Sequence, residues 1–523
     1  MPIDTDAPLS PGWWFSRLLA ELGARQARYN LLDAYYRGDP PPPWGPENCS
    51  AAFRKFQRKA RANWASLIVE AVRERQVPVG FRTGAGGDEF GDAEAWRIWQ
   101  ANNLDAEWKP HARAKLSMSD AYMIVGPAPA GSTVPLITPE DPRQVITAPD
   151  PGNRRSTRAA LKVFCDDWTG DDVAFLYLPG FVLRARRRSS SSGMFGWGVE
   201  GWEWDGDPQA LGVPVVPVVR FPNRSDLYGR SLGEFEDVID DIDRINLMLL
   251  QRLTVAVMQA FRQRAVQGSL PQSDHNGDPI DYSDMFRADP GAIWSLPDGV
   301  TMWESGGVDL TPILESVKAD VRDLAATTRT PMFYLFPDAA NGSAEGASLQ
   351  REGLIFKVTD RNDESSDPLE QVMSLAFLFA GDTARASTGD MEVLWAPPER
   401  FSLTERASAA TQAAAAGVPW QTIMTDFLQF SPQQVQRMAA ERATDALLTP
   451  SSNAPQAPSD ASSNADNAAA LKQSAEALGQ LIRAGVDPQD AAKRVGLDGI
   501  AFTGAVPVSL RVPDSQATSL ETK

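Results

Sequence analysis

The feature that most constrains this chain is a long, regular pattern over residues 231–268. Apolar residues recur there every three or four positions, which is the spacing of one face of an α-helix. They are Phe235, Val238, Ile239, Ile242, Ile245, Leu249, Leu253, Val257 and Phe261. Thirty or more residues at about 1.5 Å each form a rod of roughly 45 Å. We therefore expect one long helix whose single apolar stripe must be covered by other elements or by other subunits.

The charges along this expected helix are also ordered. Ser231 and Glu234 have the spacing of a capping box, which predicts the start of the helix. Six acidic residues lie between Glu234 and Asp243, and arginines occupy the later turns. This order suits the helix dipole, which favours anions at the first turn and cations at the last. One flank is left acidic, and a solvated helix face explains that flank about as well as a functional role does.

The periodicity elsewhere predicts a mixed α+β fold. Residues 1–120 carry apolar residues at helical spacing, and from Tyr122 the period changes to two. The expected strands are 121–127, 160–167, 173–187, 197–206, 212–223 and 391–399. The expected later helices are 311–329, 347–381, 404–417, 419–430 and 432–448. A low-complexity linker is expected at 449–467, since it lacks the apolar residues needed to fold.

Two of the later helices have clear local signals. Thr311 is expected to cap the helix that has Pro312 at its first position. Pro368 should kink the helix over 347–381 or end its first half, because proline lacks the backbone donor of a helix interior. These residues predict where the two helices start and where one of them is disturbed.

The segment that follows the long helix differs from its surroundings. Two short apolar runs, 292–296 and 300–303, flank the turn sequence Pro-Asp-Gly at 297–299, which predicts a β-hairpin. Four nearby side chains superficially suggest a calcium loop: Asp274, Asn276, Asp278 and Asp281. An EF-hand needs Gly at its sixth position and Glu at its twelfth, whereas this sequence has Pro279 and Met285 there. We therefore disfavour calcium and expect no metal or cofactor.

Charge and rare residue types exclude several function classes. The formal net charge of −18 argues against a protein that grips nucleic acid, because phosphate neutralisation requires clustered Lys and Arg. Cys49 and Cys165 cannot make a disulfide framework and indicate a reducing compartment. His111 and His275 are far apart, so a His-based triad or zinc site is improbable. We find no secretion signal, no membrane-spanning stretch and no enzyme constellation in the sequence.

A stretch without large side chains separates the helices expected at 311–329 and 347–381. It consists of Ala340, Asn341, Gly342, Ser343, Ala344, Glu345 and Gly346. Asn341-Gly342 is a turn signal, because both residues tolerate positive φ. A phosphate-binding loop would need G-x-x-x-x-G-K-[ST], and both the spacing and the lysine are missing. The stretch is therefore expected to protrude as a loop that does not bind nucleotide.

The order of these elements resembles the portal proteins of long-tailed bacteriophages, in particular those of phages that infect actinobacteria. The resemblance covers the chain from about residue 35 to about residue 510. It rests on 35-YYRGDPP-41, 99-WQANNLD-105, 121-AYMIVG-126, 229-GRSLGEFEDVIDDIDRIN-246, 331-PMFYLF-336 and 341-NGSAEGASLQREGLIFKV-358. Each segment is weak alone, and their joint order makes the match fairly specific.

The resemblance implies a portal fold that forms rings. The implied parts are a wing at 1–228, a first stem helix at 229–262, a clip at 263–310, a second stem helix at 311–335, a tunnel loop at 336–346, a kinked helix with a return strand at 347–400, and a helical crown at 401–523. The tunnel loop would include residues 340–346. The acidic wall of the stem channel would consist of Glu234, Glu236, Asp237, Asp240 and Asp241. The clip would contact partners through Trp294, Asp298 and Trp303, unless both tryptophans are buried in its own small core.

The resemblance also implies partners and a location. A homo-oligomeric ring, usually of twelve copies, would occupy one capsid vertex of the virion after assembly in the host cytoplasm. Double-stranded DNA would pass through it without sequence specificity. The terminase large subunit, the head-tail adaptor, and the major capsid and scaffolding proteins would bind it, and no membrane would be involved. The missing phosphate-binding loop agrees with a motor that resides in the terminase.

An acidic, small-residue channel suits fast DNA movement, because every neutralised phosphate adds a contact that must be broken at the next step. Two alternatives stay open from the sequence. The chain could be another virion protein, such as a capsid or adaptor subunit, or a cytoplasmic enzyme whose catalytic residues the sequence does not reveal.

Overall fold

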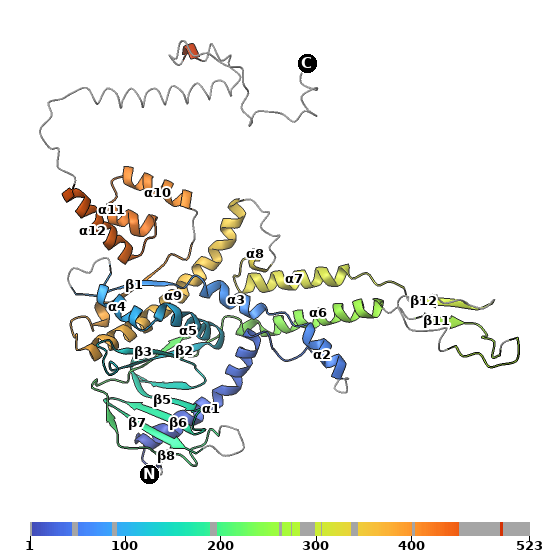
Figure 1. The fold of residues 1–523 in the computed structure, drawn as a ribbon, viewed down its shortest axis with the longest axis horizontal. Coiled ribbons are helices and arrows are strands. Elements are labelled where there is room, and N and C mark those ends of the chain that lie inside the picture. Colours follow the sequence, from blue (N-terminus) through green and yellow to red (C-terminus); the bar gives the residue numbers. More distant parts are fainter. Residues whose placement is uncertain are drawn as a thin grey trace. The chain divides into compact units, whose positions relative to one another are not determined.

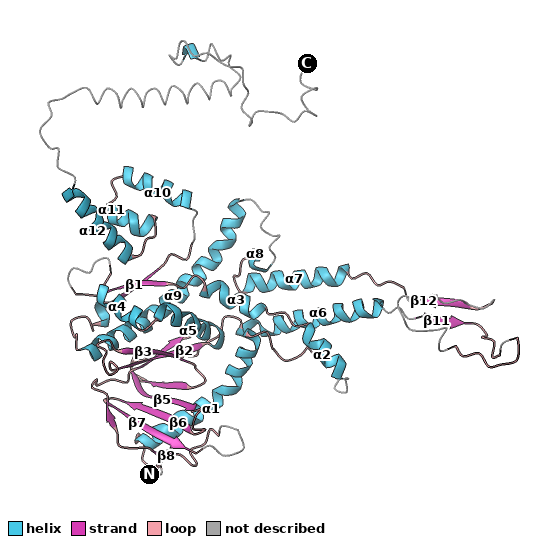
Figure 2. Cartoon of the chain, in the orientation of Figure 1, coloured by secondary structure: helices cyan, strands magenta, loops and turns pink. Residues whose placement is uncertain are grey.

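The computed structural model describes residues 3–43, 51–85, 91–188, 196–260, 264–273, 275–282, 299–304, 306–335, 344–399, 403–448 and 492–494. Contacts between residues divide the chain into two compact units, Met1–Ala439 and Ala440–Lys523. The first unit combines helices with antiparallel sheets, so the expected α+β class is confirmed (Figure 2). No helix among the described residues is both long and apolar enough to cross a membrane.

The largest sheet packs against the N-terminal helix. Its strands are β4 (Val145–Pro149), β5 (Thr157–Cys165), β6 (Asp172–Leu178), β7 (Phe181–Arg187) and β8 (Glu203–Trp204) in that order, and β9 (Gln209–Ala210) also pairs with β7. Helix α1 (Pro11–Tyr36) starts at Ser10, whose hydroxyl accepts a hydrogen bond from the Trp13 amide. Its residues Phe15, Leu18 and Leu22 are buried against the sheet, which fixes α1 across one face.

A second sheet has helices packed on it. Its order is β10 (Val218–Pro222), β2 (Asp120–Gly126) and β3 (Leu136–Glu140). Helices α4 (Ala93–Ala101), α5 (Leu104–Met118) and α9 (Ala344–Ala380) share a buried apolar cluster with it. A separate two-stranded sheet joins β1 (Pro78–Arg82) to β13 (Glu392–Trp395), which pairs the N-terminal region with a strand 310 residues later. Long-range pairing therefore holds this part of the fold together.

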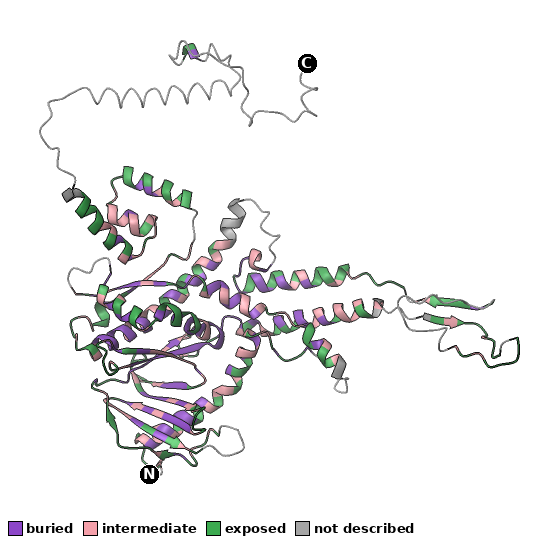
Figure 3. Ribbon diagram, viewed as in Figure 1, coloured by how far each residue is buried: buried purple, intermediate pink, exposed green. Residues whose placement is uncertain are grey.

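Two helices run side by side away from the sheets (Figure 1). A short 3-10 helix, Glu236–Val238, leads into α6 (Ile239–Ala260), and α7 (Thr311–Thr327) packs along it and is followed by α8 (Met332–Leu335). At their sheet-proximal ends Ile242 and Ile245 share a buried cluster with Val321 and Leu324. Burial decreases along the pair, and Val257 is 43% exposed (Figure 3). The expected apolar stripe is therefore covered within this chain over its first half only.

The predicted ends of the first long helix are wrong. Helix α6 begins at Ile239 rather than at Ser231, because the Ser231 and Glu234 side chains are engaged with other elements instead of forming a capping box. It ends at Ala260, and β11 (Arg264–Gln267) follows as a strand. Strand β11 pairs with β12 (Thr301–Glu304). The sequence predicts 292–296 as the partner of 300–303, and residues 292–296 lie outside those that the structure describes.

The other elements are found with shifted bounds. The residue that caps α7 is Leu310 instead of Thr311, and the Asp309 carboxylate accepts a hydrogen bond from the Thr311 amide. The strand expected at 173–187 is two strands, separated by a turn with Gly180 at φ +86. Helix α9 starts at Ala344, three residues before the expected 347, and continues past Pro368. Proline therefore does not end this helix.

The described residues from 403 to 448 are largely helical, as expected. Helix α10 (Leu403–Ala415) is followed by a single turn, α11 (Trp420–Thr422), and a π-helical turn, Ile423–Phe427. Helix α12 (Pro432–Leu448) starts at the predicted proline. Two further helices, α2 (Ala51–Lys59) and α3 (Trp64–Arg73), lie between α1 and β1 in the chain.

We predict that Trp99→Ala lowers the free energy of unfolding by about 3–5 kcal/mol, the usual cost of removing a buried aromatic side chain. Trp99 is 1% exposed and packs against Trp96, Trp108 and Phe81. Urea unfolding followed by circular dichroism measures the loss. The matched control is Trp168→Ala, at a tryptophan that is 97% exposed, and a similar loss in that variant would contradict the assigned core.

Candidate functional site

A buried carboxylate lies just before α6. The side chain of Glu234 is only 1% exposed, and its two oxygens face two cations of α9. The distances are 2.8 Å to Lys357 Nζ and 2.5 Å to Arg361 Nε. Asn223 donates a further hydrogen bond to the same carboxylate at 3.0 Å. Lys357 and Arg361 lie on α9, and Asn223 directly follows β10. The carboxylate is therefore surrounded by side chains whose backbone positions are fixed by a helix and a strand.

This cluster joins three helices. Lys357 Nζ also donates to the backbone carbonyl of Thr328, the C-cap residue that follows α7, at 3.0 Å. Burial raises the pKa of Glu234, but the nearby charges of Lys357 and Arg361 outweigh it and hold the pKa at about 2. Glu234 therefore stays ionised, and its charge connects the start of α6, the end of α7 and the middle of α9.

A third buried cation, Lys115, contacts the same region of α9. Lys115 of α5 is fully enclosed and donates to the Ser365 hydroxyl at 2.6 Å. Burial lowers the pKa of Lys115 to about 8. Since a buried amine without a partner is costly, this contact fixes α9 against α5 as well.

Ion pairs at the surface surround the first turns of α6. Glu236 pairs with Arg28 of α1 at 2.6 Å, and Asp237 pairs with Arg224 at 2.7 Å. Tyr35 donates a hydrogen bond to Asp243 at 2.7 Å. Farther along, Arg244 of α6 lies 3.2 Å from Asp320 of α7. These contacts hold the base of the two paired helices in one orientation.

The acidic residues expected to line a channel wall are not equivalent. Glu234 cannot present its charge to a channel, because it is buried and ion-paired, so that expectation is wrong for this residue. Asp241 pairs with Arg244 at 3.0 Å. Asp240 is exposed, and no ion pair is found for it in the described part of the chain. Of the acids at the start of α6, Asp240 is therefore the one best placed to meet another molecule.

The other predicted site residues lie largely outside the described residues. This is true of Trp294, Asp298 and Ala340 to Ser343, whereas Ala344, Glu345 and Gly346 form the first turn of α9. Trp303 lies on β12 and is 56% exposed, so it is not part of a buried core. Within the described ranges, no group of three or more acidic, histidine or cysteine side chains is arranged to hold a metal ion.

Sequence reasoning missed the partners of Glu234. Lys357 and Arg361 are four residues apart on one face of α9, a spacing that could have flagged a basic helix face. Nothing local connects that face with Glu234, which is 127 residues away from Arg361. The printed contacts of this cluster are ion pairs and hydrogen bonds between separate elements. These contacts position the helices relative to one another.

We predict that Glu234→Gln lowers the free energy of unfolding by about 3–5 kcal/mol at pH 7, because it leaves two buried cations without their anion. Urea unfolding at a series of pH values tests this. The stabilisation by the carboxylate is present above its ordinary pKa of 4.5 and is lost as the pH falls toward the folded value of about 2. The difference in the free energy of unfolding between the variant and the parent protein should therefore shrink as the pH falls from 4.5 toward 2.

The matched control is Asp240→Asn, which removes an exposed charge in the first turn of α6. Its cost should stay within about 0.5 kcal/mol, as for most surface substitutions. Equal losses in the two variants would show that the buried cluster has no special role.

Comparison with known proteins identifies the family. A family model described as "Phage portal protein, SPP1 Gp6-like" matches residues 16–446 of this chain. The portal protein of Mycobacterium phage D29 is 32% identical over 376 residues, which are 68% of this chain and 72% of the relative. The portal protein of Mycobacterium phage L5 is 31% identical over 376 residues, which are 68% of this chain and 73% of that relative. The chain therefore belongs to the phage portal protein family.

Proposed function

We propose that this chain is the subunit of a ring at one capsid vertex, through which double-stranded DNA is packaged and later ejected. Portal proteins are structural components of phages and not enzymes, and DNA packaging is their general role. The observation that carries the proposal is the family match over residues 16–446, which favours a portal over a capsid or adaptor subunit. Twelve copies are the expected number for such a ring.

The paired helices supply physical support for a ring. Leu249 and Leu253 of α6 are only half-buried, and Val257 and Leu314 are 43% and 36% exposed. An apolar stripe of this kind is costly in water and gains free energy when a neighbouring helix covers it. In a closed ring every subunit has two neighbours, so each stripe finds a partner without an open end. We assign α6 and α7 to the stem of the ring.

The assignments of the remaining parts follow the chain order. Residues 263–310, with the β11–β12 ladder, would form the clip that meets the terminase large subunit during packaging and the head-tail adaptor afterwards. Residues 336–346 would be the tunnel loop next to the DNA, and α9 would be the helix behind it. The C-terminal helices would form the crown. The major capsid and scaffolding proteins would surround the ring in the virion, which assembles in the host cytoplasm.

The ring is tested by negative-stain electron microscopy of the purified protein, together with mass measurement. We expect annuli with a central hole and a mass that is a whole multiple of the subunit mass of 56.9 kDa, twelvefold for a dodecamer. A monodisperse monomer at high protein concentration would count against the proposed function.

The clip assignment is tested at Trp303. Because this exposed aromatic side chain offers a large apolar contact area, Trp303→Ala should weaken binding of the adaptor or terminase at least tenfold while rings still form. Pull-down or biolayer interferometry with each partner gives the measurement. Trp168→Ala, at another exposed tryptophan, is the matched control and should bind normally. Unchanged affinity of the Trp303 variant for both partners would remove Trp303 from the clip contact.

A further inference from the structure

Helix α2 is basic in a chain that is acidic overall. The run 54-RKFQRKAR-61 has five basic residues and no acidic one, whereas the whole chain has a formal net charge of −18. Between Phe53 and Lys59, every exposed position is a lysine or an arginine. The net charge of the chain therefore conceals a concentrated patch of positive charge on this helix.

One side of α2 is attached to the rest of the fold. Gln57 and Ala60 are 4% and 3% exposed, and the Gln57 side chain donates a hydrogen bond to the Pro43 carbonyl at 2.9 Å. Just beyond the helix, the Ala62 amide donates to the Asn246 side chain of α6 at 2.9 Å. These contacts fix the orientation of α2, so its other side has a defined position.

The other side of α2 carries the basic face, which consists of Lys55, Arg58 and Lys59. At about 100° per residue, these three residues lie within an arc of about 100° around the helix axis, and Gln57 lies on the far side. All three are exposed, and none has an acidic partner among the residues that the structure describes. Their charges therefore face solvent.

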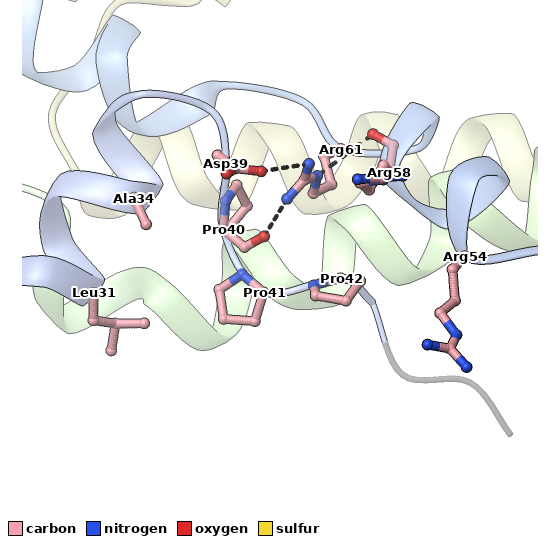
Figure 4. A pocket seen from close by; sticks show the side chains of 9 residues that line it. All are labelled: Leu31, Ala34, Asp39, Pro40, Pro41, Pro42, Arg54, Arg58 and Arg61. Carbon is pink, nitrogen blue, oxygen red and sulfur yellow. Dashed lines mark hydrogen bonds and ion pairs between the residues drawn. The ribbon is translucent and has the colours of Figure 1, made fainter. Parts of the chain in front are cut away.

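Arginines at one edge of α2 line a groove of about 710 Å³ (Figure 4). They are Arg54, Arg58 and Arg61. The groove also includes the prolines at 40–42. Arg61 pairs with Asp39 at 2.6 Å, and Arg54 has a contact of its own. These contacts belong to the groove, whereas the two lysines of the basic face are not part of its lining and extend the positive surface away from it.

The basic face costs the helix stability when nothing is bound to it. Like charges four residues apart on a helix repel each other, and Arg54 with Arg58 and Lys55 with Lys59 have this spacing. The helix dipole accounts for cations in the last turn, Arg58 and Lys59, but not for those in the middle of the helix. A bound polyanion would offset this repulsion.

The composition of the basic face favours a phosphate backbone over a protein surface. The buried centres of protein interfaces are enriched in aromatic residues and depleted in lysine. Contacts to nucleic-acid phosphates come mainly from lysine, arginine and other hydrogen-bond donors. Two of the three residues of the basic face are lysines, and no exposed position of α2 between residues 53 and 59 is apolar. A phosphate backbone therefore matches this face better than an apolar protein patch does.

We propose that the basic face of α2 binds the phosphate backbone of double-stranded DNA without regard to sequence. The identity of the polyanion rests on the proposed function, which brings double-stranded DNA to this protein. Lys55, Arg58 and Lys59 each donate hydrogen bonds to a phosphate oxygen and neutralise its charge. Because one side of α2 is already attached, the face needs little ordering when DNA binds.

This contact differs in kind from the expected channel wall. Every neutralised phosphate adds a contact that must be broken before DNA moves on. The basic face of α2 therefore suits DNA that is held against the protein, whereas an acidic wall suits DNA in transit.

The salt dependence of DNA binding by the full-length protein tests the contact. The probe is a short labelled double-stranded DNA, followed by fluorescence anisotropy at about 50 to 200 mM NaCl. The parent protein should bind with a Kd of about 1–100 µM near physiological salt. Replacing all three residues of the basic face with Gln should weaken binding at least tenfold at the lowest salt. The slope of log K against log[NaCl] should become shallower by about 2.7, since each phosphate contributes about 0.9.

Two controls accompany this variant. A matched triple variant, Lys109→Gln with Arg154→Gln and Arg188→Gln, removes three exposed positive charges elsewhere and should keep the slope of the parent protein. Near-ultraviolet circular dichroism checks that both variants are folded. Two duplexes of unrelated sequence should bind the parent protein with affinities within about threefold of each other, because phosphate contacts carry no sequence information.

The outcomes separate this inference from the proposed function. Equal loss of affinity in both triple variants would show an effect of net charge alone and overturn the contact. Undetectable DNA binding by the parent protein would also overturn it, as would displacement of the DNA by polyglutamate at an equal concentration of charge, which would assign the face to an acidic protein segment. Negative-stain images of the same samples report on the ring. Normal rings with any of these results leave the proposed function intact. Absence of rings in a parent protein whose DNA binding depends on α2 would remove the proposed function and support the contact.

Discussion

The orientation of the long helices depends on the buried carboxylate of Glu234. Removing three charged groups from water is costly, and the cost is offset here because the opposite charges lie 2.5 and 2.8 Å apart and Asn223 adds a hydrogen bond. Lys357 also donates a hydrogen bond to Thr328, the C-cap residue of α7. One cluster thus connects the segment before α6, the end of α7 and α9. Since such a cluster is stable only when every charge has its partner, we infer that it restricts the angle between the paired helices and α9.

This fixed base explains the uneven burial of α6. Near the cluster, Ile242 and Ile245 are covered by α7 and by the core. Farther along, α6 and α7 pack against each other, and Val257 and Leu314 are 43% and 36% exposed. Apolar side chains that are exposed in one subunit gain free energy when another molecule covers them. In the proposed ring, the end of α6 near the cluster would set the direction of the stem, and the more exposed end would supply contact area between subunits.

The acids at the start of α6 fall into two groups: most are paired within the chain, and Asp240 is exposed. Most acids at the start of α6 have partners within the chain, namely Arg28, Arg224 and Arg244. Asp240 is exposed, and Arg58 on α2 likewise shows no acidic partner among the described residues. The net charge of −18 describes the chain as a whole, whereas a single exposed charge such as that of Asp240 can make a specific contact with another molecule.

The sequence by itself determined the α+β class, the existence of the two paired helices, the start of α12 at Pro432 and the resemblance to portal proteins. These features follow from periodicity, proline positions and motif order, which are local in the chain. Only the tertiary structure decided where α6 begins and ends. Glu234 was assigned to a helix cap, but its partner Arg361 lies 127 residues away, and β11 pairs with a strand beyond residue 300. Local spacing cannot reveal such contacts, because they arise only when distant segments are brought together in the fold.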